Sequence, residues 1–145
     1  MKSSRLITHR PKELIGNFVT ENAGESPGWG DHETIALMDA KGIVAGVVYS
    51  RFCARGGGLF QDCDMNIAAR KGSLWATPEF LHRVFHYPFI QLGCKRVTAL
   101  IGANNLASIK MVEHIGFKRE AEIQRGLPDQ NLLIYGLFPE NCKWI

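Results

Sequence analysis

The pattern of apolar and polar positions predicts strands and helices that alternate along most of the chain. Apolar residues recur at helical spacing after Pro11 and Pro78, and both prolines suit the first turn of a helix. Asn105 is a good N-cap for a third helix. In chain order, we expect a short strand 5–8, a helix from 11, strands 34–38, 43–49 and 59–69, a helix 78–92, a strand 96–101, a helix from 105, and strands 118–124 and 131–138.

The order of these elements predicts an α/β fold. A strand, a helix and a strand between residues 59 and 101 imply a right-handed parallel crossover. Tight connections at 39–42 and 126–130 add antiparallel strands, so the sheet is expected to be mixed and flanked by helices. With no repeat or linker in the sequence, we expect residues 1–145 to form one domain, with any ligand where strand ends meet helix starts.

The helix predicted at 78–92 carries two further features. Pro88 should kink or shorten it, because proline removes one backbone hydrogen bond. His82 and His86 lie four residues apart on one face, a spacing that binds metals, but no carboxylate accompanies them as in a metalloprotease motif. We therefore expect no metal site there.

The strand 59–69 carries an unusual polar face. Asp62, Asp64 and Asn66 alternate with apolar residues, so their side chains should lie side by side. Polar side chains on an interior strand are costly unless they face a cleft or find partners. The pattern therefore indicates either a functional cleft or a solvated strand face, and both alternatives stay open.

A turn of small and basic residues follows this strand and leads directly into the helix at Pro78. Arg70 and Lys71 supply two cations, while Gly72 and Ser73 are small enough to let an anion approach the backbone. Free backbone N–H groups and a helix N-terminus would meet at this turn, and this combination suits a phosphate. Two adjacent cations by themselves would equally describe a solvated turn.

Composition excludes few classes of function. The chain has 145 residues, of which 46% are hydrophobic and 21% are charged, as in an ordinary soluble globule. The net charge of +3 is weak evidence for nucleic acid, and cations and aromatic residues are not interleaved. Apolar runs are too short to cross a membrane, so we expect no membrane partner, and we recognise no signal peptide. The irregularly spaced cysteines suggest reduced thiols, so we expect a cytoplasmic protein.

The run Asn-Leu-Ala-Ser at 105–108, followed by Gly116, Phe117 and Glu120, resembles the Asn-x-x-Ser … Gly-Phe … Glu signature of the GNAT acetyltransferases. It looks closest to the branch that acetylates protein N-termini, ribosomal proteins among them, and antibiotic or polyamine amines. The resemblance runs from Thr34 to the C-terminus. It implies the GNAT fold, in which two parallel strands splay apart, and transfer of an acetyl group from acetyl-coenzyme A to a primary amine.

The same resemblance implies a site for coenzyme A, with pantetheine between the splayed strands and the pyrophosphate on the turn. The turn departs from the usual Arg/Gln-x-x-Gly-x-Gly/Ala pattern because Leu74 and Trp75 are bulky. Trp75 would pack against pantetheine or plug the core. The implied contacts with coenzyme A are Met65, Asn66, Ile67, Arg70, Lys71, Gly72, Ser73, Leu74, Trp75, Ala76, Asn105 and Ser108.

Ser108 is the implied catalytic acid, because Val112 stands where many GNAT members place a tyrosine. The alternative is that the Ser108 hydroxyl bonds to its own helix backbone. Asp64 and Asp62 are the candidate bases, directly or through a water, and a water wire without an essential carboxylate is a close alternative. Asn105 would hold a pantetheine amide while capping its helix.

The acceptor is a protein or small-molecule amine that the sequence does not name, and a monomer and a homodimer are both open. GNAT members usually carry two helices between their first two strands, whereas segment 11–33 has room for one helix and a loop at 24–30. In this respect the chain resembles small acetyltransferases of phages and bacteria. The smaller lid predicts an open slot for a projecting amine. Candidate lining residues are Trp29, His32 and Glu33.

The atypical turn and the missing tyrosine also motivate a rival hypothesis. In it, the chain is a non-catalytic interaction module with this fold, which binds a protein, with or without coenzyme A, and transfers no acyl group.

Overall fold

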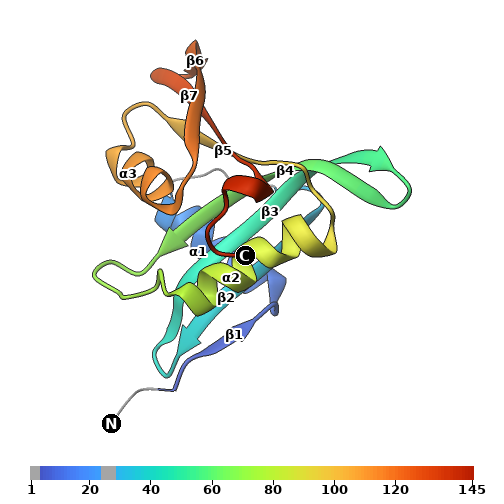
Figure 1. Ribbon diagram of the computed structural model, residues 1–145. Helices are drawn as coiled ribbons and strands as arrows, with labels where there is room; N and C mark the ends of the chain where they lie inside the picture. Colours follow the sequence, from blue (N-terminus) through green and yellow to red (C-terminus); the bar gives the residue numbers. More distant parts are fainter. Residues whose placement is uncertain (1–3, 24–28) are drawn as a thin grey trace.

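A twisted sheet of seven strands, in the order β1-β2-β3-β4-β5-β7-β6, crosses the molecule (Figure 1). The computed structural model describes residues 4–23 and 29–145, so part of the predicted loop 24–30 lies outside the described residues. The β4–β5 pair is parallel and the other neighbours are antiparallel, which confirms the predicted mixed sheet. The strands are Leu6–Thr8 (β1), His32–Asp39 (β2), Gly42–Gly56 (β3), Leu59–Ala69 (β4), Val97–Gly102 (β5), Lys118–Leu127 (β6) and Gln130–Leu137 (β7).

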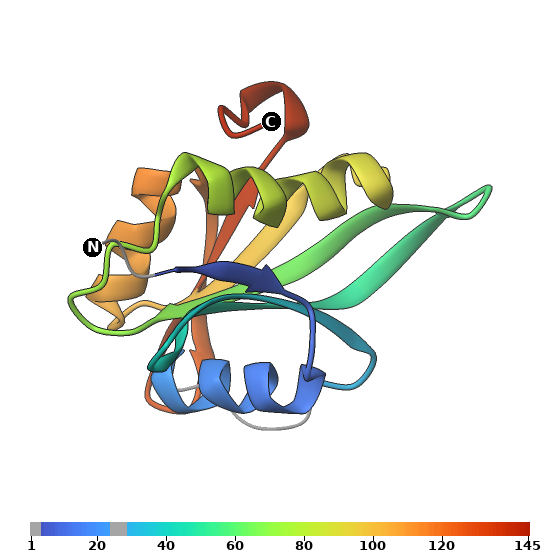
Figure 2. The same cartoon turned by 90° about the horizontal axis from the view of Figure 1, so that it is seen from below.

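Helices cover the two faces of the sheet unequally. Figure 2 shows α1 on one face, with α2 and α3 on the other. The helical segments are Lys12–Ala23 (α1), Pro78–His86 (α2), a π-helical turn Tyr87–Gln91 (η1), Leu106–Ile115 (α3) and a 3-10 turn Pro139–Asn141 (η2). Among the described residues, no helix is long and apolar enough to cross a membrane.

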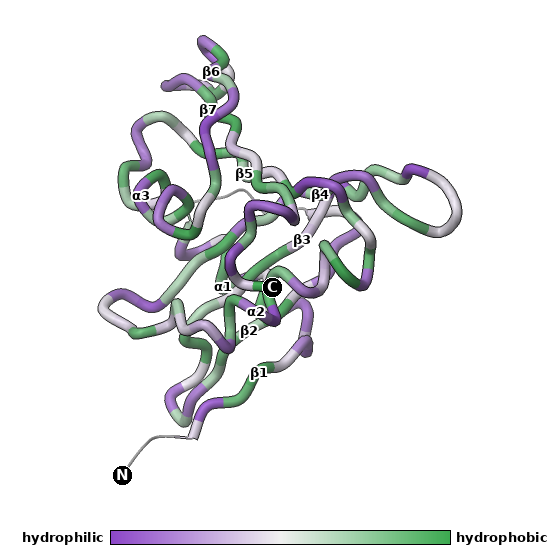
Figure 3. Tube along the Cα trace, in the orientation of Figure 1, coloured by the Kyte–Doolittle hydropathy of each residue, from purple (hydrophilic) through white to green (hydrophobic). Residues whose placement is uncertain are grey.

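The helix α1 packs directly onto strand β3. Ile15 and Val19 are fully buried on its inner face. A Cβ atom added at Gly46 would lie 3.2 Å from Val19 and 3.3 Å from Ile15, so a side chain at this position would push the helix away. Figure 3 colours the middle of β2 and β3 as hydrophobic, as expected for strands covered on both faces.

The helix α2 buries its apolar stripe, which includes Phe80, Val84 and Phe85, in the main core. It ends at His86 and continues as the π turn around Pro88, which confirms that this proline shortens the regular helix. The ring atom Nδ1 of His82 lies 2.9 Å from the backbone oxygen of Trp144. The C-terminal tail therefore folds back across α2.

The strand β3 extends beyond the predicted residues 43–49 and reaches Gly56. Its last part forms an arm with the start of β4, which projects from the body in Figures 1 and 2. The rings of Phe52 and Phe60 pack in this arm with centroids 5.7 Å apart. Arg55 donates to the carbonyl oxygens of Phe60 (3.1 Å) and Gly93 (3.1 Å), which ties the arm to the segment before β5.

Candidate active site

Strands β4 and β5 part after one pair of residues. Among the described residues, their parallel ladder consists of the pair Asp64 and Thr98, whereas β5 and β7 pair along their whole overlap. Before this pair, the Gln61 carbonyl accepts the backbone N–H groups of Lys95 (3.0 Å) and Arg96 (3.3 Å). Beyond it the strands diverge and expose backbone groups to a gap. The splayed pair that the resemblance implies is therefore present, and we call it the fork.

A narrow cleft occupies the fork. Its volume is about 30 Å³, room for about two water molecules, so a larger ligand must part the walls. Met65 and Met111 lie in the walls, and methionine side chains adapt easily to a new shape. The lining residues are Ala23, Met65, Asn66, Ile67, Ala99, Leu100, Ile101, Asn105, Ser108, Met111, Val112 and Phe117.

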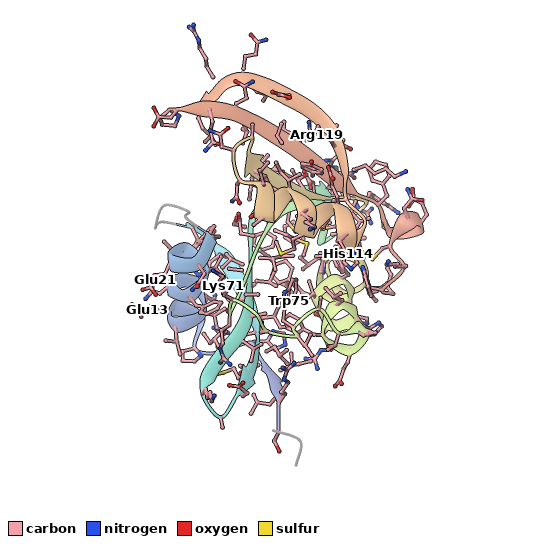
Figure 4. The ribbon with its side chains drawn as sticks, turned by 90° about the vertical axis from the view of Figure 1, so that its left-hand side faces the viewer. Glu13, Glu21, Lys71, Trp75, His114 and Arg119 are labelled. Atoms are coloured by element: carbon pink, nitrogen blue, oxygen red, sulfur yellow. The ribbon has the colours of Figure 1, made fainter. Side chains whose placement is uncertain are left out.

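A second hollow of about 300 Å³ lies between the turn after β4 and the start of α3. It shares Ile67, Ser108 and Met111 with the cleft, so the two spaces meet at these side chains. In Figure 4, Lys71 and Trp75 lie on this side of the molecule, between α1 and α2. A channel therefore runs from the turn into the fork.

The turn keeps most of its backbone N–H groups free. The N–H of Arg70 donates to Val44 (2.7 Å), and that of Ser73 donates to the Arg70 carbonyl (3.1 Å). The backbone at Gly72 has a φ of +75°, which glycine adopts without strain. Within the described part of the chain, the other N–H groups of the turn have no protein acceptor, namely those of Lys71, Gly72, Leu74, Trp75 and Ala76.

The side chain of Arg70 bonds to another part of the protein and does not extend freely towards the turn's N–H groups. Its guanidinium donates to both carboxylate oxygens of Asp39 (2.9 and 3.0 Å) and to the Ile43 carbonyl (3.1 Å). The Arg70 hydrogen bonds lower the pKa of Asp39 to about 2, with a smaller contribution from the Lys41 N–H. Arg70 thus anchors the turn to the β2–β3 hairpin, and exposed Lys71 is the other cation on the turn.

The two carboxylates of the polar face predicted on β4 have hydrogen-bond partners, whereas Asn66 lines the cleft. Asp64 Oδ1 accepts Arg51 Nε at 2.9 Å and lies 2.7 Å from Arg51 Nη2. Asp62 Oδ2 accepts Arg51 Nη2 at 2.7 Å, and Asp62 Oδ1 accepts Thr98 Oγ1 at 2.9 Å. Neither carboxylate is among the described residues that line the cleft. Because Arg51 occupies both carboxylates and neither lines the cleft, this geometry favours the water-wire alternative over a direct base.

Sequence reasoning missed Arg51, Arg96 and Thr98. Arg51 has a φ of +49°, where an irregular register of β3 turns its side chain towards β4. Arg96 Nε donates to Thr98 Oγ1 (3.2 Å), and its Nη2 donates to Glu120 (2.7 Å). The buried Thr98 lies within the strand predicted at 96–101, where its polar contacts were not foreseen. No sequence signal marks the bulge that places Arg51.

The start of α3 carries the two motif residues as the sequence predicts. Asn105 Oδ1 accepts the backbone N–H of Ser108 at 3.2 Å, which confirms Asn105 as the N-cap. The Ser108 hydroxyl has no hydrogen-bond partner among the described residues, and the residue lines both hollows. The alternative of a local bond to the helix backbone is therefore not what the structure contains. Val112 is buried beside them.

The residues expected to line the acceptor slot do not lie together in the structure. Trp29 packs on α1, where a Cβ added at Gly16 would lie 3.4 Å from its Nε1. His32 Nδ1 donates to the Gly30 carbonyl at 2.8 Å, and its Nε2 would lie 3.9 Å from a Cβ added at Gly16. Glu33 alternates to the other face and pairs with Lys12 at 3.2 Å. Of the three, His32 shares the α1 face with Asp64.

No protein-family model matches the sequence, and no curated protein matches it. Solved structures do match the fold. The ribosomal-protein-S5-alanine acetyltransferase of Vibrio fischeri has a TM-score of 0.69 at 11% identity, over 100% of this chain and 97% of that one. The spermidine N-acetyltransferase of Vibrio cholerae, in complex with CoA and spermine, has a TM-score of 0.71 at 12% identity, over 94% and 96%. A putative acetyltransferase of Acinetobacter baylyi has a TM-score of 0.70 at 12% identity, over 97% of this chain and 96% of that one.

The fold is therefore that of the GNAT acetyltransferases, as the sequence motif implied. At 11–12% identity the likeness establishes the architecture, while the chemistry depends on the residues of this chain.

Proposed function

We propose that this protein transfers an acetyl group from acetyl-coenzyme A to a primary amine on a protein N-terminus, a lysine or a small molecule. Residues 1–145 then make up one acetyltransferase domain. The observation that carries the proposal is the fork, since β4 and β5 part after Asp64 and Thr98 into a cleft that continues to the turn. The V. cholerae structure with CoA supports this choice of donor.

The residues around the channel fit the parts of the donor. The free N–H groups of the turn suit the pyrophosphate, and Lys71 adds a positive charge beside them. Asn105 Oδ1 is used by the helix cap, so its Nδ2 remains free to donate to a pantetheine carbonyl. The exposed backbone of Met65, Asn66 and Ile67 would bind the pantetheine amides as a neighbouring strand does.

Acetyl transfer requires the amine nitrogen to form a bond with the thioester carbon while the carbon–sulfur bond breaks. The departing sulfur takes up one proton, and the amine nitrogen loses one. Ser108 lines both hollows, and its hydroxyl donates a proton to sulfur and regains one from water. A backbone N–H at the fork end of β4 stabilises the charge on the thioester oxygen.

The proton from the amine leaves through water along the α1 face. Arg51 holds Asp62 and Asp64, so these carboxylates act on that water and do not take the proton directly. His32, which shares this face with Asp64 through the register of β2, β3 and β4, would lie beside this path. A face covered by one helix would admit an amine that projects from a larger molecule.

The test combines calorimetric titration of coenzyme A with an assay of thiol release from acetyl-coenzyme A in the presence of an amine panel. The panel holds peptides with free N-termini, lysine peptides and polyamines. We expect binding, and thiol release that depends on at least one amine class. Tight binding without amine-dependent release would replace the proposal by the non-catalytic interaction module, and absence of binding would reject the acetyltransferase.

A further inference from the structure

The inner end of the cleft stops abruptly. Among its lining residues, Met65 on β4 and Ala99 on β5 each stand one position beyond the pair Asp64 and Thr98, where the two strands pair. If the donor binds as proposed above, its thioester lies in the fork and its acyl group points towards this closed end. What closes the end therefore decides how long an acyl group the fork can hold.

Two layers close it. On the face covered by α2 and α3, Cys63 and Val97 precede the closing pair and are completely buried (0% exposed) in the main core. Interiors are close-packed, so an acyl chain cannot extend into this layer without displacing core side chains. A longer acyl chain could therefore extend only towards the α1 face of the sheet.

A polar cluster blocks that second direction. We call it the clasp and define it as Arg51, Asp62, Asp64, Arg96 and Thr98. Thr98 is 4% exposed and Asp64 is 9% exposed, so two polar side chains are buried at the point where the strands meet. Asp62 bonds across the fork to Thr98 Oγ1 at 2.9 Å, which joins β4 to β5 by side chains behind their last backbone pair.

Arg51 and Arg96 brace the clasp from both sides. Arg51 bonds to both carboxylates, and Arg96 Nε donates to Thr98 Oγ1 at 3.2 Å. A longer acyl chain would have to break these charge-assisted hydrogen bonds and lay methylene groups against ions. The inference requires that an acetyl group ends before it reaches them.

We propose that the clasp is the floor of the acyl pocket and that Asp62 and Thr98 restrict the donor to short acyl groups such as acetyl. The inference depends on the proposed function, and it adds the property that the fork alone does not give, namely which acyl groups the protein accepts.

Calorimetric dissociation constants for coenzyme A, acetyl-, butyryl- and hexanoyl-coenzyme A test this without knowledge of the amine. We expect the parent protein to bind the acetyl form at least about tenfold more tightly than the hexanoyl form. In Thr98→Ala, which removes the bond to Asp62 and opens space, this ratio should fall by about tenfold while the affinity for coenzyme A itself is kept.

Thr98→Ser is the matched control, because it keeps the hydroxyl and should keep the preference. Asp62→Asn is a second variant of unchanged size, and it should weaken the preference without opening a cavity. Glu120→Gln, which alters a partner of Arg96 outside the clasp, should leave the profile unchanged. Thermal unfolding of each variant establishes that it is folded.

The outcomes separate the two levels of the argument. If Thr98→Ala and Asp62→Asn bind coenzyme A normally and keep the parental acyl profile, the floor assignment is overturned while the proposed function stands. If the parent binds none of the four ligands, both are overturned. Equal affinity of the parent for acetyl and hexanoyl forms overturns the floor alone.

Discussion

Asn105 Oδ1 accepts the backbone N–H of Ser108, and this bond separates the tasks of the two motif residues. The cap satisfies the helix start, so the Ser108 hydroxyl is free to face the channel. The bond also leaves the Asn105 amide nitrogen as a donor. Binding and proton transfer can therefore be tested by separate substitutions.

Ser108→Ala should lower kcat by about a hundredfold, because it removes the hydroxyl proposed to protonate sulfur. The dissociation constant for coenzyme A should change little. Steady-state kinetics and calorimetry measure the two effects. Ser108→Thr keeps a hydroxyl and should retain more activity than Ser108→Ala, whereas equal kcat in Ser108→Ala and the parent would remove this role.

Asn105 can be tested with two variants that differ in one function. Asn105→Ala removes the cap and the amide donor, so it should destabilise the protein by about 1 kcal/mol and weaken coenzyme A binding. Asn105→Asp keeps the capping oxygen and should fold with nearly parental stability while still binding coenzyme A poorly. Parental affinity in Asn105→Asp, measured by calorimetry, would show that the amide nitrogen does not contact the ligand.

Lys71→Ala should weaken coenzyme A binding by about threefold at low salt, because one exposed cation near a phosphate contributes little. The loss should diminish as salt is added. Pantetheine lacks the phosphates, so its affinity should be the same in the parent and the variant. Lys41→Ala, on the β2–β3 hairpin, is the charge-matched control, and an equal loss there would mean that the effect is general electrostatics.

The Asp39–Arg70 pair predicts a specific response to acid. The pKa of Asp39 falls from 3.8 to about 2 in the folded protein, chiefly through the Arg70 hydrogen bonds. A lowered folded-state pKa stabilises the protein above pH 3.8, and this contribution is lost as the pH falls towards 2. The free energy of unfolding should therefore drop more steeply across that window in the parent than in Asp39→Asn.

The same substitution loosens the anchor of the turn. Asp39→Asn should weaken coenzyme A binding at neutral pH, since the turn amides lose a fixed position. Parallel pH profiles of the two proteins, measured by denaturant titration, would contradict the pairing.

The sequence was most informative where short-range rules decide structure. The alternation in 59–69, the N-cap at Asn105 and the break at Pro88 all follow from neighbours within one turn or strand, and the structure confirms them. The polar face of β4 was also identified, together with its need for a cleft or partners. The partners of these polar residues were not identified, because Arg51 reaches Asp62 through an irregular register of β3 that alternation does not reveal.

A similar limit applies to the turn. The sequence places Arg70 on a turn that suits a phosphate, but its contact with Asp39 joins residues far apart along the chain. Composition and spacing give the charge of such a residue, and the fold determines which group neutralises it. The free amides, in contrast, follow from a strand that runs directly into a helix.

The cleft of about 30 Å³ between Met65 and Ala99 has a consequence for the timing of encounters. If coenzyme A binds as proposed, the resting protein offers free backbone N–H groups to its phosphates but only a narrow entry to the arm that follows them. Binding of coenzyme A should thus begin with its phosphates at the surface, followed by a slower opening of the two cleft walls. Rapid-mixing fluorescence of Trp75, beside the entrance, would then report two successive phases, of which the second stops accelerating as ligand concentration rises.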